Sequence, residues 1–252
     1  MRLDRAAGVA SRLVVAAQSP STNAELRQAS RDAVSWPHLS VLLTDTQTAG
    51  RGRLDRSWVT PPGSALAASV LLRELPSGAR ERGWIPLAAG VAMTDAVAAQ
   101  LPGHRVGLKW PNDVLVDGRK ICGILAEATP DSVIVGAGVN TAMTAEQLPV
   151  PTATSFAALG APVDADTLIA DYLTRLAAIV AALGDGAVAS GLHAAAVARC
   201  VTLGQPVRVH LPGGGEMVGT AARIDEDGRL VVDDGQGEHA VSAGDVVHVR
   251  PV

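Results

Sequence analysis

Cysteine is scarce in this sequence, which has only two among 252 residues, Cys122 and Cys200. Neither has a second cysteine or a histidine at the spacing of a zinc site. This pattern excludes a disulfide framework and a structural zinc centre, both of which need several partners at short intervals. A low cysteine count is typical of proteins in a reducing compartment, so we expect a cytoplasmic protein.

Long apolar runs are also missing. The longest, such as 65–68 and 176–183, fall far short of the ~20 residues that cross a bilayer. Arg12 interrupts the apolar stretch near the N-terminus, which argues against a signal peptide. We therefore expect no membrane span and no membrane partner.

A basic excess is absent too, because 25 acidic residues outnumber 21 basic ones and give a net charge of −4. General nucleic-acid binders normally carry a basic footprint, so no nucleic-acid partner is expected. With 48% hydrophobic residues, the chain can still bury a core.

Lysine and asparagine are rare: Lys109 and Lys120 are the only lysines, and Asn23, Asn112 and Asn140 the only asparagines. A codon bias toward arginine and alanine explains such scarcity. The positions that keep these residues therefore merit inspection.

The patterning predicts an α+β chain with a mixed β-sheet domain packed with helices and a small C-terminal antiparallel β-barrel. The Asp117-Gly118 pair predicts a tight hairpin turn, and short β segments separated by turn signals begin at Leu203. We place the domain boundary near Thr202, giving domains 1–202 and 203–252. Strands are expected at 13–17, 40–45, 64–73, 106–109, 113–116, 120–127 and 132–135, and helices at 22–31, 84–100, 164–183 and 187–199.

A long loop is predicted over 47–63, where Gly, Pro and charged residues cluster. In it, glycines alternate with Arg51 and Arg53, and Arg56 follows. Glycine lets the backbone approach a ligand, and arginine forks bind carboxylate and phosphate oxygens. An anion-binding loop and a merely solvated loop are about equally supported by this motif alone.

The segment Leu108–Asp113 combines Lys109 with a Trp-Pro turn, Asn112 and Asp113. The last two side chains either cap the turn or hold a magnesium ion and a ribose. In the next strand, alternation places Lys120, Cys122 and Ile124 on one face and Gly123 and Leu125 on the other. A glycine inside a strand suggests close approach, so a ligand carboxylate near Lys120 with its body against Gly123 is one interpretation.

The sequence Gly136–Thr141 lacks the third glycine of a dinucleotide fingerprint, and no helix signal follows it. Phosphate-loop, esterase-elbow and HExxH signatures are absent as well. Taken together, four short segments contain both lysines and all three asparagines: 21–23, 47–58, 107–127 and 136–141. This concentration indicates that these residues are kept at their positions for function and not by chance.

Together these segments resemble the biotin protein ligase family. The sequence contains STN (21–23), QTAGRGR (47–53) followed by Trp58, KWPND (109–113), RKICGIL (119–125) and GAGVN (136–140), in the family's order and approximate spacing. Each motif is weak alone, but five in order are specific. The resemblance covers essentially the whole chain, because the family also ends in a small β-barrel.

The resemblance implies a catalytic biotin/ATP-binding domain and a two-step reaction. Biotin and ATP, with Mg²⁺, form biotinoyl-5'-adenylate, and a lysine of a biotin carboxyl carrier protein then takes the biotinyl group. A mixed anhydride is prone to hydrolysis, so the arginine loop is expected to close over it. No permanently bound cofactor is implied.

Site residues follow from the matching motifs. The resemblance assigns catalysis to Arg51, Arg53 and Lys120, and biotin binding to Ser21, Thr22, Asn23, Gln47, Gly50, Arg51, Lys120 and Gly123. It assigns nucleotide binding to Arg53, Arg56, Trp58, Lys109, Asn112, Asn140 and Arg250. Mg²⁺ is expected on the ATP phosphates, with Asp113 as the candidate protein ligand.

Two positions depart from the family pattern. Asp55 stands where a small Gly or Asn is more common, which lessens the loop's positive charge or alters its folding. Cys122 replaces a more common Ala, which predicts thiol-sensitive activity.

About 20 residues precede the STN motif, too few for the N-terminal DNA-binding domain of some relatives. We therefore expect an enzyme without DNA-binding activity, as a monomer or weak homodimer. The alternatives are a lipoate or octanoate protein ligase and a non-catalytic biotin sensor. With two lysines, the chain is also expected to biotinylate itself little.

Overall fold

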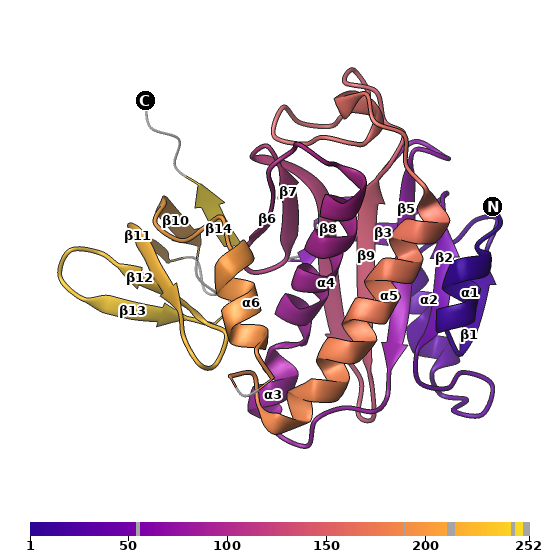
Figure 1. Cartoon of the computed structure of the whole chain (residues 1–252), viewed down its shortest axis with the longest axis horizontal. Coiled ribbons are helices and arrows are strands. Elements are labelled where there is room, and N and C mark those ends of the chain that lie inside the picture. The colour runs from indigo at the N-terminus through magenta and orange to yellow at the C-terminus, as the bar shows by residue number, and fades with distance from the viewer. Residues whose placement is uncertain (54–55, 189, 211–214, 243–244, 249–252) are drawn as a thin grey trace.

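The computed structural model describes residues 1–53, 56–188, 190–210, 215–242 and 245–248. Its centre is a seven-stranded sheet in the order β1-β2-β5-β9-β8-β7-β6 (Figure 1). Only the β1–β2 pair is parallel, and the other neighbours are antiparallel. The strands are β1 (Arg12–Val15), β2 (Ser40–Thr44), β5 (Ala65–Leu72), β6 (Val106–Lys109), β7 (Asp113–Val116), β8 (Arg119–Ala128) and β9 (Val133–Asn140).

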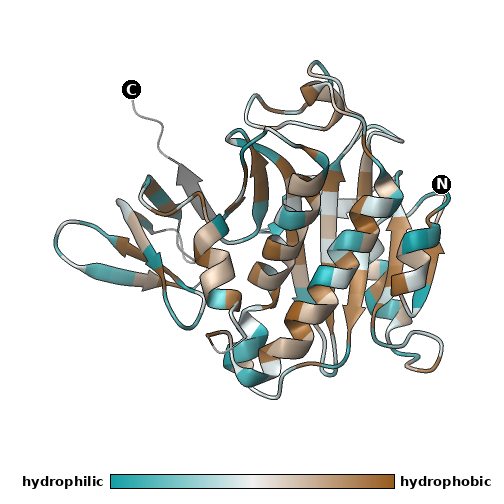
Figure 2. Ribbon diagram, in the orientation of Figure 1, coloured by the Kyte–Doolittle hydropathy of each residue, from teal (hydrophilic) through white to brown (hydrophobic). Residues whose placement is uncertain are grey.

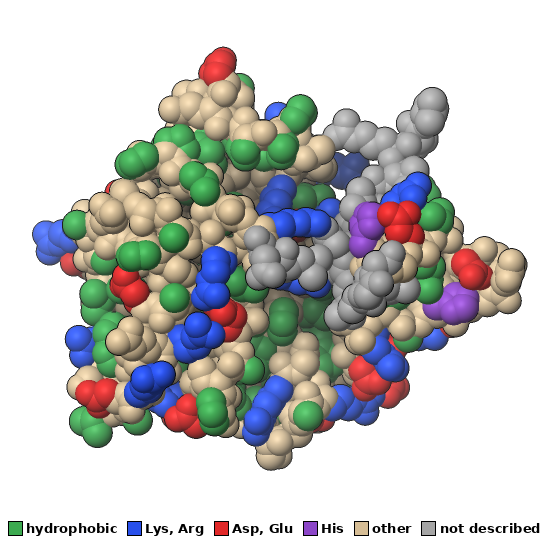
Figure 3. All heavy atoms as spheres, turned by 180° about the vertical axis from the view of Figure 1, so that it is seen from behind, with side chains coloured by type: hydrophobic (Ala, Val, Ile, Leu, Met, Phe, Trp, Pro, Cys, Tyr) green, Lys and Arg blue, Asp and Glu red, His purple; other side chains and the backbone are tan. Residues whose placement is uncertain are grey.

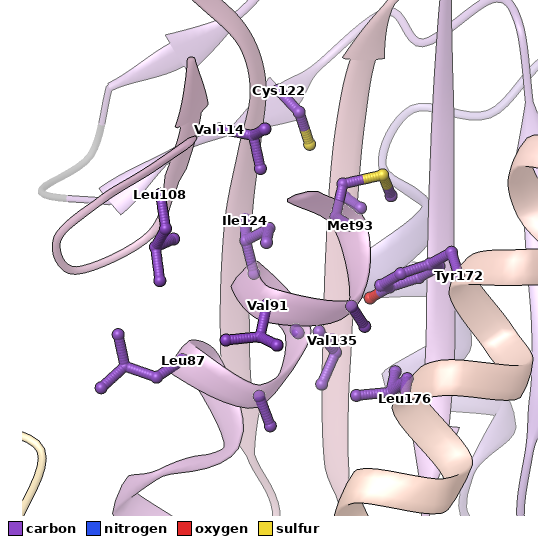
Figure 4. Close-up of a cluster of buried hydrophobic side chains, with 14 of the residues drawn as sticks. Leu87, Val91, Met93, Leu108, Val114, Cys122, Ile124, Val135, Tyr172 and Leu176 are labelled. Carbon is purple, nitrogen blue, oxygen red and sulfur yellow. The ribbon is translucent and has the colours of Figure 1, made fainter. Parts of the chain in front are cut away.

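Helices α4 and α5 cover one face of this sheet, and α1 and α6 flank them (Figure 1). Apolar side chains of the strands and the helices meet on this side of the sheet, and much of the large sheet is brown in Figure 2. Figure 4 shows Met93, Cys122 and Tyr172 meeting in this core. The helices are α1 (Asp4–Val9), α3 (Ala79–Gly83), α4 (Ile85–Gln100), α5 (Ala165–Ala182) and α6 (Leu192–Arg199), with short 3-10 turns η2 (Ala157–Leu159) and η3 (Leu183–Asp185).

The opposite face of the sheet carries α2 (Thr22–Ala29). Leu26 of this helix packs on Leu42, Leu71 and Ile134, which form a second, smaller apolar cluster. Since α2 is only eight residues long, it covers one end of the face and leaves the other end open. The open end holds the candidate site.

The β7–β8 hairpin confirms the predicted turn: Asp117 has φ 49° and Gly118 has φ 77°. The alternation predicted for β8 is wrong at its start. Val114 pairs with Cys122 but Leu115 pairs with Lys120, so Ile121 is an extra residue in a β-bulge. The bulge turns Lys120 onto the face that carries Gly123, which a strict two-residue period cannot do.

A second antiparallel sheet follows in the order β13-β12-β11-β10-β14. It lies at the β6 end of the large sheet, beside α6 (Figure 1). Its edge strands β13 and β14 do not pair within the described residues, so the expected barrel is an open sheet there. Its strands are β10 (Pro206–His210), β11 (Glu216–Ile224), β12 (Leu230–Asp233), β13 (Glu238–Val241) and β14 (Asp245–His248).

Helix α5 and the turn after it are long and apolar enough to cross a membrane by length and composition, which the search for apolar runs did not anticipate. In the structure, however, Leu168, Tyr172, Leu173 and Leu176 of this helix are buried in the core. Its apolar character is therefore accounted for by packing against α4 and α1.

Several short elements were not predicted, namely α1, α3, β13 and the β3–β4 hairpin within the predicted loop. Each is short, and β13 has a single buried residue, Val241, so its sequence gives almost no periodic signal. Strand β9 extends eight residues to Asn140, well beyond the predicted end at Val135, because the glycines that weaken its pattern still pair with β5 and β8.

Candidate active site

The cavity at the open end of the sheet has a floor of small residues. Ala67, Gly138 and Gly123 lie side by side on β5, β9 and β8, and Gly136 pairs with Leu125 in the next row. A Cβ at Gly138 would lie 2.7 Å from Cε2 of Trp58. The absence of side chains on this floor is therefore what makes room above the sheet.

The N-terminus of α2 forms one wall. Ser21 caps the helix by accepting a hydrogen bond from the N–H of Ala24 (3.4 Å). The Thr22 N–H donates to Oε1 of Gln47 (3.0 Å), and this bond fixes the loop before Gly50 against the helix. Ser21, Thr22, Asn23 and Gln47 all line the cavity.

Asn23 is the most constrained side chain of this wall. Its Nδ2 donates to Oε2 of Glu127 (2.8 Å) and to the carbonyl of Leu125 (3.2 Å). Its Oδ1 lies 2.6 Å from Oγ of Ser69. A buried amide with three partners is held in one orientation, so Asn23 presents a fixed edge to the cavity.

A short hairpin, β3 (Gly50–Arg51) and β4 (Ser57–Trp58), forms the second wall. It carries Trp58 over the glycine floor, where Cζ3 would meet a Cβ on Gly123 at 3.5 Å. The Nζ of Lys120 lies 5.7 Å from the centre of the same ring. The predicted long loop thus contains regular structure, and Trp58 contacts the floor itself.

Cationic groups surround this cavity, and Figure 3 shows basic side chains gathered around a hollow on this face. Arg51, Arg53, Arg56 and Lys120 line it. Asp113 is the only carboxylate among the described lining residues, and its Oδ1 lies 2.7 Å from Nζ of Lys120. The site therefore has an excess of positive charge and suits an anionic ligand.

Asn112 connects the arginine loop to the sheet. Its Oδ1 accepts a hydrogen bond from Nη1 of Arg53 (2.9 Å), while its Nδ2 donates to the carbonyl of Ile124 (2.7 Å). Burial lowers the pKa of Arg53, and the neighbouring Arg56 lowers it further while Asp113 opposes the shift. Burial also lowers the pKa of Lys109 on the adjacent strand.

Glu127 balances part of this charge at the far side of the cavity. Its Oε1 lies 3.3 Å from Nη2 of Arg51 and 3.7 Å from Nη1 of Arg27. Since Oε2 also accepts from Asn23, one carboxylate orients an arginine and an amide that both line the cavity.

Most predicted site residues meet in this cavity: Ser21, Thr22, Asn23, Gln47, Arg51, Arg53, Arg56, Trp58, Asn112, Asp113, Lys120 and Gly123. Gly50 lies in β3 beside the lining residues, and Lys109 and Asn140 lie outside the lining. Asn140 is buried and donates to the carbonyl of Thr154 (2.9 Å), which holds the chain after β9. Arg250 and Asp55 lie outside the described residues.

The burial of Cys122 argues against the expectation that this residue makes activity thiol-sensitive. Cys122 is fully buried and points into the helical core, opposite the cavity (Figure 4). Burial raises the pKa of its thiol, so the reactive thiolate is suppressed.

Sequence reasoning missed several lining or supporting residues, chiefly Ala67, Ser69, Gly136, Gly138 and Glu127. The alternating glycines of β9 were the available signal, because a strand with glycine at every second position leaves one face bare. The roles of Ser69 and Glu127 depend on contacts with Asn23, which the sequence does not specify.

Known proteins share this architecture. A profile of the "Biotin/lipoate A/B protein ligase family" matches residues 15–140, and one of the "Biotin protein ligase C terminal domain" matches residues 202–249. The chain is 41% identical over 241 residues to the biotin--[acetyl-CoA-carboxylase] ligase of Mycobacterium tuberculosis, covering 94% of this chain and 89% of that ligase. The chain belongs to the biotin protein ligase family.

Other members of the ligase family agree with this result. The biotin--[acetyl-CoA-carboxylase] ligase of Paracoccus denitrificans is 33% identical, with 91% of this chain and 98% of that ligase covered. The solved biotin protein ligase from Aquifex aeolicus, in complex with biotin and ATP, has a TM-score of 0.78 at 24% identity and covers 96% of this chain and 100% of that one. At 24% identity, the similarity to the Aquifex aeolicus structure shows a shared fold.

Proposed function

We propose that this protein uses ATP to attach biotin to a lysine of a biotin carboxyl carrier protein through biotinoyl-5'-adenylate. The observation that carries the proposal is the placement of Lys120 and the arginine loop around a floor of alanine and glycine on which Trp58 packs. Both named relatives, at 41% and 33% identity, are biotin--[acetyl-CoA-carboxylase] ligases, which supports biotin as the substrate.

In the proposed arrangement, the biotin rings lie between the floor and the α2 wall, in contact with Thr22, Asn23 and Gly123. The biotin carboxylate then lies near Arg51 and Lys120. Its oxygen attacks the α-phosphorus of ATP, and pyrophosphate leaves. A carrier lysine amine next attacks the acyl carbon of the adenylate, forming an amide and releasing AMP.

The cations stabilise charge that develops in the first step. Lys120 and Arg53 face the phosphoryl group, where fixed positive groups stabilise the transition state and the leaving pyrophosphate. The ammonium of Lys120 lies 2.7 Å from Oδ1 of Asp113 and has three N–H donors, so it can hold this carboxylate and a substrate oxygen together. Arg56, Trp58, Lys109 and Asn112 serve the nucleotide side.

Mg²⁺ fits the donor set as an ion held mainly by substrate. Among the described residues no cluster of three metal-ligating side chains exists, but Asp113 lines the cavity. Proteins often bind Mg²⁺ through one carboxylate together with nucleotide phosphates. Asp113 would hold the ion, which neutralises phosphate charge when bound.

The ligase and its two alternatives are distinguished by one assay. Purified protein is mixed with Mg-ATP and either biotin or lipoate, and pyrophosphate is measured. Release with biotin alone, followed by a biotinyl mass gain on a carrier domain, is the expected result. Release with lipoate identifies a lipoate ligase, and biotin binding without release identifies a sensor; either result overturns the proposal.

The remaining assignments stay predictions with their own tests. The division into domains 1–202 and 203–252 is tested by hydrogen exchange, in which the two parts should open as separate cooperative units. A monomer or weak homodimer is tested by sedimentation, and the absence of DNA binding by mobility shift at physiological salt. Cytoplasmic location is tested by fractionation of cells.

A further inference from the structure

One tight turn joins the C-terminal sheet to the rest of the molecule. Residues 225–229 connect β11 and β12, and the carboxylate of Asp225 accepts hydrogen bonds from the N–H groups of Asp227 and Arg229 (both 2.9 Å). Gly228 completes the turn with φ 78°. These bonds hold the backbone of the turn in one conformation, so its carbonyl groups point in fixed directions.

Three side chains of the first 202 residues bind alternate carbonyls of this turn and of the last residue of β11 before it. Nε1 of Trp84 donates to the carbonyl of Glu226 (3.1 Å), and Nε1 of Trp110 donates to that of Gly228 (3.0 Å). Nε2 of His193 lies 2.9 Å from the carbonyl of Ile224. Both tryptophans are buried, at 0% and 2% exposure, so these bonds are shielded from water.

The two tryptophans differ in what lies next to them. Trp84 precedes α4, far from the cavity residues in sequence, and packs edge-to-face against His193. Trp110 lies between Lys109 and Asn112, and its own N–H donates to Oγ1 of Thr202 (3.0 Å). The segment 109–113 is thus bonded to Thr202 at the domain boundary, to Gly228 in the β11–β12 turn, and to the cavity through Asn112 and Asp113.

We infer that Trp110 is a positioning residue for the nucleotide side of the site. Through Thr202 and Gly228 it fixes the segment 109–113 relative to the C-terminal sheet, and so fixes the direction in which Asn112 and Asp113 face the cavity. Trp84 makes the same kind of bond to the same turn but positions no cavity residue. This inference rests on the proposed ATP-dependent function.

The matched pair Trp110→Phe and Trp84→Phe tests it. Each variant removes one indole N–H and leaves one turn carbonyl without its partner, so both should lose similar thermal stability. Pyrophosphate release is measured while ATP and biotin are varied separately. For Trp110→Phe we expect the KM for ATP to rise about tenfold, because a buried hydrogen bond is lost from the supporting segment. The KM for biotin should stay within about twofold of wild type.

Trp84→Phe should change neither KM by more than about twofold. A second pair acts on the other bond: Thr202→Val removes the acceptor and should reproduce the ATP-specific defect, whereas Thr202→Ser keeps the hydroxyl and should restore wild-type values. This pair decides the question if Trp110→Phe shows no thermal transition.

Equal effects of Trp110→Phe and Trp84→Phe on the KM for ATP overturn the inference, as does a KM for ATP within about twofold of wild type in both Trp110→Phe and Thr202→Val. A wild-type protein that releases no pyrophosphate with biotin is a different result, because it refutes the proposed function before any variant is compared.

Discussion

The contact between Gly136 and Asn23 permits a quantitative test of how the cavity wall is built. A Cβ at Gly136 would lie 2.9 Å from Cγ of Asn23 and closer still to its Oδ1. Asn23 cannot yield cheaply, because it is bonded to Ser69, Leu125 and Glu127. Gly136→Ala therefore displaces the amide and breaks most of these bonds.

The expected loss follows from the bonds involved. Two neutral hydrogen bonds contribute about 1 kcal/mol each, and one to a carboxylate about 1.5–3 kcal/mol. Removing a glycine from a strand returns about 0.5–1 kcal/mol. Since some bonds re-form, we expect a net destabilisation of about 2 kcal/mol. For a chain of this size, that lowers Tm by roughly 4–8 °C.

Thermal unfolding measures this effect, and Gly8→Ala is the matched control. Gly8 lies in α1 with nothing within 4 Å of its would-be Cβ, so the same exchange should be neutral or stabilising there. Asn23→Ala supplies the decisive background, because the clash disappears with the amide. If Gly136→Ala is destabilising to the same extent, within about 0.5 kcal/mol, with and without Asn23, the reasoning is refuted.

Four further outcomes are expected. Lys120→Ala should abolish adenylate formation with a Tm near wild type, because its half-exposed side chain supplies charge and not core volume; retained pyrophosphate release would remove Lys120 from the mechanism. Arg53→Ala should increase escape or hydrolysis of the adenylate, and an unchanged amount of free adenylate by chromatography would contradict that role. Burial lowers the pKa of His38, whose Nδ1 accepts hydrogen bonds from the N–H groups of Arg73 and Glu74. The free energy of unfolding should therefore fall as the pH drops below the unfolded pKa of about 6.5. The variant His38→Asn should lose this part of the pH dependence, and identical profiles of stability against pH in the two proteins would disprove it. Cys122 should resist a thiol reagent until the protein unfolds, whereas modification of the native protein would show that its burial is only transient.

Local patterns predicted most of the fold. The Asp117-Gly118 turn and the strands Val106–Lys109 and Asp113–Val116 were predicted with the bounds that the structure has, because turn chemistry and period-two alternation are properties of neighbouring residues. The unpredicted elements, which include α1, α3 and β13, are too short to show a period.

The site was predicted as a set of residues but not as a surface. Alternation alone placed Lys120 opposite Gly123, because a one-residue bulge at Ile121 depends on pairing with β7 and leaves no local signature. The bond of Asn23 to Glu127, 104 residues away in sequence, is likewise set by the sheet order and not by either residue's neighbours.

The positions of the two lysines have a practical consequence for labelling chemistry. Lys120 is engaged with Asp113, and Lys109 lies partly buried on the same face of the sheet. An amine-reactive dye or an activated resin therefore meets no fully exposed lysine side chain on this protein. Amine labelling of either lysine should accordingly be slow in the native protein.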